Sequence, residues 1–326
     1  MRKKQLEENQ IWIYAIVLLL GIGIGLWNPS LKFLDTNLES LISPVLGLLL
    51  YSMFVQIPFF NLYQTFTNKQ IFSVALLVIN FLVVPVVVWL LSLFLPDHPP
   101  LLLGLYLVLL TPCIDYVVVF THLGHGDAKL ILTSTPLLLL VQMLCLPLYL
   151  WLLMGEQAAE VIKAEPFIEA FLFLIVLPLA MALLTEYWAK RHRSGESWAQ
   201  ITSWLPVPFM ALTLFLVVVS QIGRIDEYLP VVKKVTPIFI AFMVIMPFLA
   251  RVVANGFRLD SQAGRALIFS AGTRNSLVVL PLALALPTEW MITSVVIVTQ
   301  TLVELVGELF YIRFVPLFTS KDYESA

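Results

Sequence analysis

Three polar groups in the middle of an apolar stretch are the first candidates for chemistry. Thr111, Cys113 and Asp115 lie within the apolar run Leu101–Phe120, which is long enough to cross a lipid bilayer. Pro112 stands among them and has no N–H group to donate, so a helix must kink or break here. Because unpaired polar groups are costly in hydrocarbon, the freed carbonyls and these side chains need a ligand, water or a partner. The pattern is typical of an interrupted transporter helix with a substrate or ion site; the alternative is a kinked helix with a structural Asp115.

A second group of polar residues interrupts another apolar segment. Residues 273–276, Thr-Arg-Asn-Ser, bring a cation, an amide and hydroxyls to membrane depth. Arg274 and Asp115 would each be very costly alone in lipid. They are therefore candidate ion-pair partners, either as a fixed structural salt bridge or as part of a binding site. Asn275 and Ser276 are further candidate ligands for a substrate.

Two carboxylates and one amide lie in the remaining apolar segments. Glu304 and Glu308 are one helical turn apart and therefore face the same side of a helix. Acids inside the membrane are typical of proton carriers, so Glu304 is a candidate for substrate binding and for ion or proton coupling. Glu308 is expected nearer the interface and solvated. Gln142 is a candidate polar neighbour of Glu304.

The two cysteines, Cys113 and Cys145, belong to no CxxC pattern. A thiolate binds soft, thiophilic species better than hard oxyanions, which makes Cys113 a candidate soft ligand. The alternative for Cys113, a small buried hydrophobe, is the role expected for Cys145. His122, His125 and Asp127 lie together, but the glycines between them favour a turn over a metal site. The sequence contains no nucleotide-binding or metalloprotease motif, so we expect no cofactor and no enzyme activity.

The composition indicates that the candidate site residues are positioned by membrane-spanning helices. Of the 326 residues 60% are hydrophobic and only 12% charged, and the mean hydropathy is +0.93. Such a chain is an integral membrane protein, and its net charge of −2 gives no electrostatic case for nucleic acid. Ten apolar segments are predicted to span the bilayer, and the polar insert at 190–203 is expected to be a loop. The predicted segments are 11–27, 38–60, 71–95, 100–121, 130–154, 166–188, 204–222, 235–255, 263–286 and 289–315.

Cationic residues predict the orientation. With the N-terminus in the cytoplasm, 13 Lys and Arg residues lie on the cytoplasmic side, five lie outside and Arg274 lies within the membrane. This bias predicts a multi-pass protein of the cell membrane with both termini in the cytoplasm.

A shift of the sequence by 162 residues predicts an internal repeat. It aligns the first five apolar segments with the last five, and it places Thr111 on Thr273 and Gln142 on Glu304. Because each half has an odd number of spans, residues 1–162 and 163–326 are predicted to be inverted repeats. The fourth and ninth segments, both interrupted, are then expected to break near the bilayer centre and to meet there.

These residues resemble those of a known family. Thr111-Pro112-Cys113, followed by an apolar run and His125-Gly126-Asp127, resembles the fourth-helix signature of arsenite efflux permeases, which belong to the bile acid:sodium symporter superfamily. Glu304 resembles the tenth-helix acid of that family, and Asn275 matches the break in its ninth helix. The resemblance covers essentially the whole chain.

The resemblance implies an all-α fold with a panel domain and a core domain in which helices 4 and 9 cross. It also implies proton-driven efflux of arsenite or antimonite, with the matching cysteine and acid essential. The chain departs from the family at Asp115 and Arg274, where uncharged residues are usual, and at Val278 and Val279, where the ninth helix usually has an acid. The Cys–Glu pair nevertheless favours the arsenical branch over the bile-acid branch.

Two other functions are compatible with the sequence. One is a symporter of a small organic anion, coupled to sodium or protons, with Arg274 holding a carboxylate and Asp115 or Glu304 holding the ion. The other is a membrane receptor or scaffold without transport, which the lack of a soluble sensing domain disfavours.

Overall fold

The computed structural model describes residues 9–27, 32–56, 59, 70–114, 116–155, 169, 172–222 and 225–319. Within these ranges the regular structure is helical apart from one isolated two-residue bridge. The chain divides into two compact units: Met1–Ile57 with Glu165–Leu229, and Pro58–Ala164 with Pro230–Ala326.

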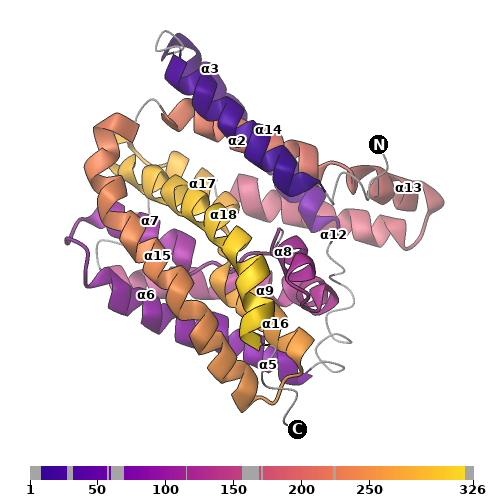
Figure 1. Cartoon of the computed structure of the whole chain (residues 1–326). Helices are drawn as coiled ribbons and strands as arrows, with labels where there is room; N and C mark the ends of the chain where they lie inside the picture. The colour runs from indigo at the N-terminus through magenta and orange to yellow at the C-terminus, as the bar shows by residue number, and fades with distance from the viewer. Residues whose placement is uncertain are drawn as a thin grey trace. The chain divides into compact units, whose positions relative to one another are not determined.

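The first unit is a group of packed helices. In Figure 1, α14 lies alongside α2 and α3, and α12 packs against α3 and α13. The hydroxyl of Tyr51 is a shared contact within the unit: it lies 2.9 Å from the hydroxyl of Thr185 and accepts a hydrogen bond of 2.9 Å from the indole of Trp198. Its elements are α2 (Gln10–Trp27), α3 (Lys32–Phe54), the π-turn η4 (Leu172–Val176), α12 (Leu177–Ala189), α13 (Arg193–Thr202) and α14 (Pro206–Ile222).

Helix α13 corrects the expectation of a loop at residues 190–203. Gly195 lets the backbone of α13 approach α12 closely, since a Cβ there would lie 2.6 Å from the carbonyl carbon of Trp188. Thr202 is buried and Trp198 donates to Tyr51, so one face of this polar segment has partners that stabilise a helix. Tertiary contacts therefore outweigh the low hydrophobicity on which the loop prediction rested.

The second unit contains the two interrupted segments and the helices that pack around them. Helix α18 packs against α7, α16 and α17, while α16 also contacts α5, α8 and α9. The elements are α5 (Gln70–Val78), the π-turn η3 (Ile79–Val83), α6 (Val84–Ser92), α7 (Pro99–Leu109), α8 (Val117–Leu123), α9 (Ala128–Met154), α15 (Ile225–Gly256), α16 (Ser261–Gly272), α17 (Ser276–Leu284), the 3₁₀ turn η5 (Thr288–Trp290) and α18 (Ile292–Thr319).

The helices are long and apolar enough for a multi-pass membrane protein. Five helical stretches of the described chain could each cross a bilayer by length and composition: Gln70–Ser92, Ala128–Met154, Arg193–Leu216, Tyr228–Gly256 and Ile292–Thr319. Helix occupies part of each of the ten predicted segments, and the number of spans stays a prediction.

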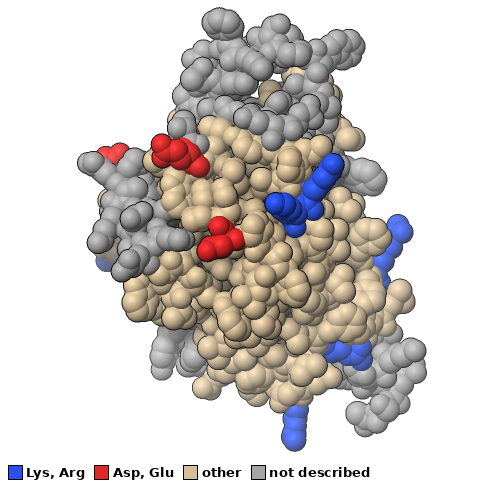
Figure 2. Space-filling view, turned by 90° about the vertical axis from the view of Figure 1, so that its left-hand side faces the viewer, with Lys and Arg blue, Asp and Glu red and all other residues tan. Residues whose placement is uncertain are grey.

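Helix α9 of the second unit buries its polar side chains and exposes large apolar ones. Helix α9 buries Ser134, Thr135 and Gln142, whereas its Leu144 is 78% exposed and its Leu152 68% exposed. The described residues on the face shown in Figure 2 are mostly uncharged, with only a few acidic and basic side chains among them. Apolar residues on the exterior, with the polar side chains kept among the buried ones, are the arrangement that a lipid environment selects.

A proline in the third predicted segment frees a carbonyl that a tyrosine binds. Pro85 has no N–H to donate to the carbonyl oxygen of Phe81, four residues before it, and the helix contains a π-turn here. The hydroxyl of Tyr149, from α9, donates to this oxygen at 2.6 Å. The tyrosine thus satisfies a backbone group that no solvent reaches in lipid.

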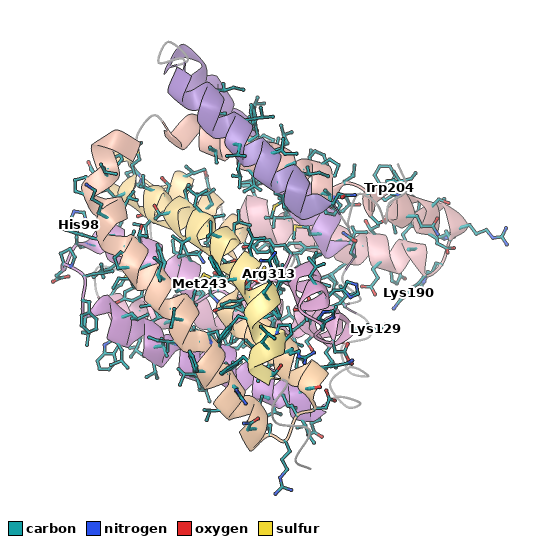
Figure 3. All side chains as sticks on the ribbon, in the orientation of Figure 1. His98, Lys129, Lys190, Trp204, Met243 and Arg313 are labelled. Carbon is teal, nitrogen blue, oxygen red and sulfur yellow. The ribbon has the colours of Figure 1, made fainter. Side chains whose placement is uncertain are left out.

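The same arrangement recurs in α15. Pro247 frees the carbonyl oxygen of Met243, and the hydroxyl of Tyr311 from α18 donates to it. Figure 3 labels Met243 on α15. Each of the three residues stands 162 positions after its counterpart in the first arrangement.

Gly104 controls the approach of α7 to α18. A Cβ at this position would lie 2.8 Å from the backbone oxygen of Thr293 and 2.8 Å from the Cβ of Val296. Small residues allow membrane helices to pack this closely.

We expect Gly104→Ala to destabilise the protein by about 1–3 kcal/mol, since the backbone oxygen that it meets cannot move independently. Gly23→Ala is the matched control, because its added Cβ meets no atom within 4 Å; it should be neutral or stabilise by up to about 1 kcal/mol. The measurement is the thermal unfolding midpoint in detergent, and equal midpoints for the two variants would contradict the close contact.

Candidate functional site

Both interruptions that the sequence predicts are present. Helix α7 ends at Leu109 and α8 begins at Val117, while α16 ends at Gly272 and α17 begins at Ser276. Each break leaves helix-terminal carbonyl and N–H groups without intrahelical partners.

The two broken segments bond to each other. The N–H of Cys113 donates to the carbonyl of Thr273 at 3.2 Å, and the N–H of Asn275 donates to the carbonyl of Thr111 at 2.8 Å. These bonds form an isolated antiparallel bridge between Pro112 and Arg274. The helix ends thereby exchange backbone bonds inside the protein, as they must where water is scarce.

Matching threonines close the ends of the two half-helices. Thr111 Oγ1 donates to the carbonyl of Leu107 at 2.8 Å, and Thr273 Oγ1 donates to that of Phe269 at 2.6 Å. Both threonines are fully buried. The two bonds, like the bridged residues Pro112 and Arg274, are related by the shift of 162 residues.

Arg274 is fully buried and its guanidinium lies at the ends of both half-helices. Nη2 contacts three oxygens, and Nη1 donates to a fourth at 3.4 Å. All four oxygens are neutral: the carbonyls of Ser270 (2.5 Å), Ala271 (2.7 Å) and Leu109 (3.4 Å), and Oδ1 of Asn80 (2.9 Å). The carbonyl ends of helices carry partial negative charge, which favours a cation here.

Asn80 is oriented by its own hydrogen bonds. Its Nδ2 donates to the carbonyl of Leu76 and to the hydroxyl of Ser270, each at 3.1 Å, which directs Oδ1 toward Arg274. Asn80 belongs to the π-turn η3, and such turns are frequent at functional sites. The ring of Phe242 covers the guanidinium, with its centroid 5.5 Å from Cζ of Arg274.

Glu304 is fully buried and joins α18 to both broken segments. Tyr116 Oη donates to Oε1 at 2.6 Å, the backbone N–H of Arg274 donates to Oε2 at 2.8 Å, and Nε2 of Gln300 also donates to Oε2. Charge-assisted bonds of this kind compensate the carboxylate for lost water. The carboxylate therefore binds the backbone of Arg274, while the guanidinium binds neutral oxygens.

Glu308 corrects the expectation of a solvated interface residue. It is fully buried, and its Oε1 lies 2.8 Å from Thr273 Oγ1, whose single proton is shared between this oxygen and the carbonyl of Phe269. Oε2 has no hydrogen-bond partner within the described residues. The polar partner, Thr273, comes from the break after α16. The spacing of residues along α18, on which the expectation rested, gives no information about this partner. Gly272, the residue before Thr273, lets α16 approach α18 closely, because a Cβ there would lie 2.4 Å from the ring of Tyr311.

The other predicted site residues that the structure describes are buried as well. Asn275 accepts from the N–H of Val278 at 3.2 Å and so caps α17. In the part of the chain that is described, three of their polar atoms have no hydrogen-bond partner. They are Asn275 Nδ2, Ser276 Oγ and Gln142 Oε1. Cys113 is fully buried and bonds to Thr273 through its backbone. Buried polar atoms of this kind are candidates to contact a bound solute.

The predicted ion pair of Asp115 and the predicted turn at residues 122–127 have different outcomes. Asp115 lies outside the described residues, so its pairing with Arg274 stays a prediction. Asp127 accepts from the N–H groups of Lys129 and Leu130 and so caps α9, which agrees with a turn at this point.

Asn80 and Tyr116 are site residues that the sequence reasoning missed. Asn80 could have been found, because it is a polar residue five positions before Pro85 in an otherwise apolar segment. The tyrosine, however, gave no sign of its bond to Glu304.

The all-helical structure of the described residues, with its five apolar helices of spanning length, is that of a multi-pass membrane protein. Residues 43–253, more than half of the chain, match the model of the Sodium Bile acid symporter family, and the chain belongs to this family of transporters. The matched range contains Cys113, while Arg274 and Glu304 lie beyond it. No curated protein matches the chain.

We expect Glu304→Ala to lower stability by more than about 2 kcal/mol, because the buried N–H of Arg274 and Nε2 of Gln300 lose their acceptor and the Tyr116 hydroxyl is left with the carbonyl of Arg274, at 3.1 Å. Glu304→Gln retains a carbonyl oxygen and should cost less. Glu196→Ala, an exposed acid on α13, is the control and should change stability by less than about 0.5 kcal/mol. Denaturation of the purified variants measures this, and equal losses for Glu304→Ala and Glu196→Ala would contradict the bridging role.

Proposed function

We propose that this protein is a proton-coupled exporter of trivalent arsenic or antimony at the cell membrane. The observation that supports it most is that Cys113 and Glu304 both bond to the same short segment. Cys113 contacts Thr273, and Glu304 contacts the next residue, Arg274. A soft ligand and an ionisable group at one crossing of broken helices suit a solute exchanged for a proton.

The proton-coupling role falls to Glu304. Its oxygens accept from Tyr116, Gln300 and a backbone N–H, so the ionised form has partners without water. Glu308, one turn along α18, is a second buried acid that Thr273 connects to the crossing. Two acids one turn apart on one helix provide a route for a proton through apolar surroundings.

The substrate-binding role falls to Cys113, together with Thr111, Asn275 and Ser276. Trivalent arsenic and antimony are thiophilic, and a cysteine is the side chain suited to them. Asp115, Arg274 and Gln142 are proposed as coupling or supporting groups.

We expect Cys113→Ala to abolish arsenite accumulation by everted membrane vesicles energised with a proton gradient. Cys145→Ala is the matched control, since this second cysteine is only partly buried in α9 and should leave accumulation unchanged. Accumulation by the Cys113 variant at the wild-type rate would contradict the soft-ligand role.

A second candidate is a sodium-coupled symporter of a small organic anion. The name of the matched family favours it. The engagement of the Arg274 guanidinium with four protein oxygens weighs against its use as the carboxylate ligand. Sodium-dependent bile-acid uptake by proteoliposomes, without arsenite transport, would favour this candidate over the first.

We also propose that residues 1–162 and 163–326 are inverted repeats of five spans each. Three pairs of contacts related by the 162-residue shift support this: the two bonds of the bridge, the threonine bonds and the tyrosine bonds to proline-freed carbonyls. An inverted pair of odd-numbered halves leaves both termini on one side. Reporter fusions at the two ends should both report the cytoplasm, and opposite locations would exclude this topology.

A further inference from the structure

We propose that the guanidinium of Arg274 is a tethered cation that fills a site which would otherwise bind Na⁺. We call the four oxygens that surround it the carbonyl cage: Leu109 O, Ser270 O, Ala271 O and Asn80 Oδ1. This inference extends the proposed function to its coupling ion and rests on the crossing of the broken helices being the transport site.

The chemistry of the cage is that of a site for a hard cation. Three of its oxygens are backbone carbonyls and the fourth is an amide oxygen, which are ligands that hard cations prefer. In transporters, the carbonyl ends of interrupted helices are the groups that coordinate Na⁺. Ser270 and Ala271 belong to the last turn of α16, and Leu109 is the last residue of α7.

The cage draws on both half-helices in matching positions. Leu109 and Ala271 are 162 residues apart, and the carbonyl of each accepts from the same guanidinium. The negative ends of two helix dipoles therefore converge on one positive group. This placement would hold a free cation as well as a tethered one.

The guanidinium acts here as a compact charge rather than as a planar fork. Nη2 alone contacts three of the four oxygens, whereas Nε has no hydrogen-bond partner in the described part of the chain. An arginine that pairs with a carboxylate would use two parallel N–H groups. The carboxylate of Glu304 instead binds the backbone N–H of Arg274.

The carbonyl cage is preorganised by contacts that do not involve the arginine side chain. Asn80 is held by two donor bonds of its own, so its oxygen would still face the site if the arginine were removed. Phe242 closes one side, with its ring centroid 5.5 Å from Cζ. Removal of the arginine side chain would thus leave neutral oxygens that a small cation can satisfy.

The test compares Arg274→Ala, Arg274→Lys and wild type, purified as full chains, by thermal unfolding in equal concentrations of sodium, potassium or choline chloride. Arg265→Ala is the matched control, because Arg265 lies on α16, the helix that ends just before Arg274, and also binds neutral oxygens, those of Thr319 and His125, but is only partly buried.

We expect the midpoint of Arg274→Ala to be lowest in choline and to rise by several degrees, saturably, with sodium. Low concentrations of guanidinium ion should restore it as well, since they replace the missing group. Wild type, Arg274→Lys and Arg265→Ala should show no sodium-specific rise.

A sodium response of Arg274→Ala no larger than that of wild type would overturn the proposal. Should Arg274→Ala fail to fold in choline, solubilisation in sodium or guanidinium decides the matter: recovery in these salts alone supports the cage, and recovery in none refutes it. Because no transported solute is present, the result is independent of whether arsenite is exported.

Discussion

Two helix breaks inside an apolar protein must satisfy each other, and the site depends on this constraint. Residues 111–113 and 273–275 exchange two backbone hydrogen bonds, and Thr111 and Thr273 bond back to their own helices. Where water is scarce, neither break would be stable alone, because each would leave bare carbonyls and N–H groups. The non-helical backbone that results is what allows side chains from α18 and η3 to contact main-chain atoms at this depth.

The crossing also places positive and negative charge among two different sets of protein partners. The guanidinium of Arg274 contacts carbonyls at helix ends, and the carboxylate of Glu304 contacts N–H and O–H donors. The two groups are joined through the backbone of residue 274 rather than by a direct charge contact. Each can therefore change its partner or its protonation without removing the hydrogen bonds of the other, which a tight ion pair would not permit.

Much of the crossing could be predicted from the sequence because its signals are local. Pro112 and the polar run 273–276 are visible breaks in apolar segments, and the structure has both. The shift of 162 residues also aligned the two breaks, and the bridged pair Pro112 and Arg274 obeys it, although the partner predicted for Arg274 was Asp115. These inferences needed no knowledge of side-chain packing.

The errors arose where distant contacts decide the outcome. Helix α13 is stabilised by its packing against α12 and by the bond from Trp198 to Tyr51, which no local pattern shows. Glu308 is buried because Thr273, far away in sequence, reaches it. The partners of Arg274 were likewise unpredictable, since three of them are backbone carbonyls, which every residue type has.

The permanent charge of Arg274 has an electrical consequence for any carrier built this way. A protonated Glu304 would leave the crossing with a charge of plus one from this pair, and an ionised Glu304 would leave it neutral. Only one of the two forms would then experience the membrane potential as it moves, at about 2.3 kcal/mol per elementary charge for each 100 mV crossed. The arginine therefore determines which half of such a cycle voltage can drive.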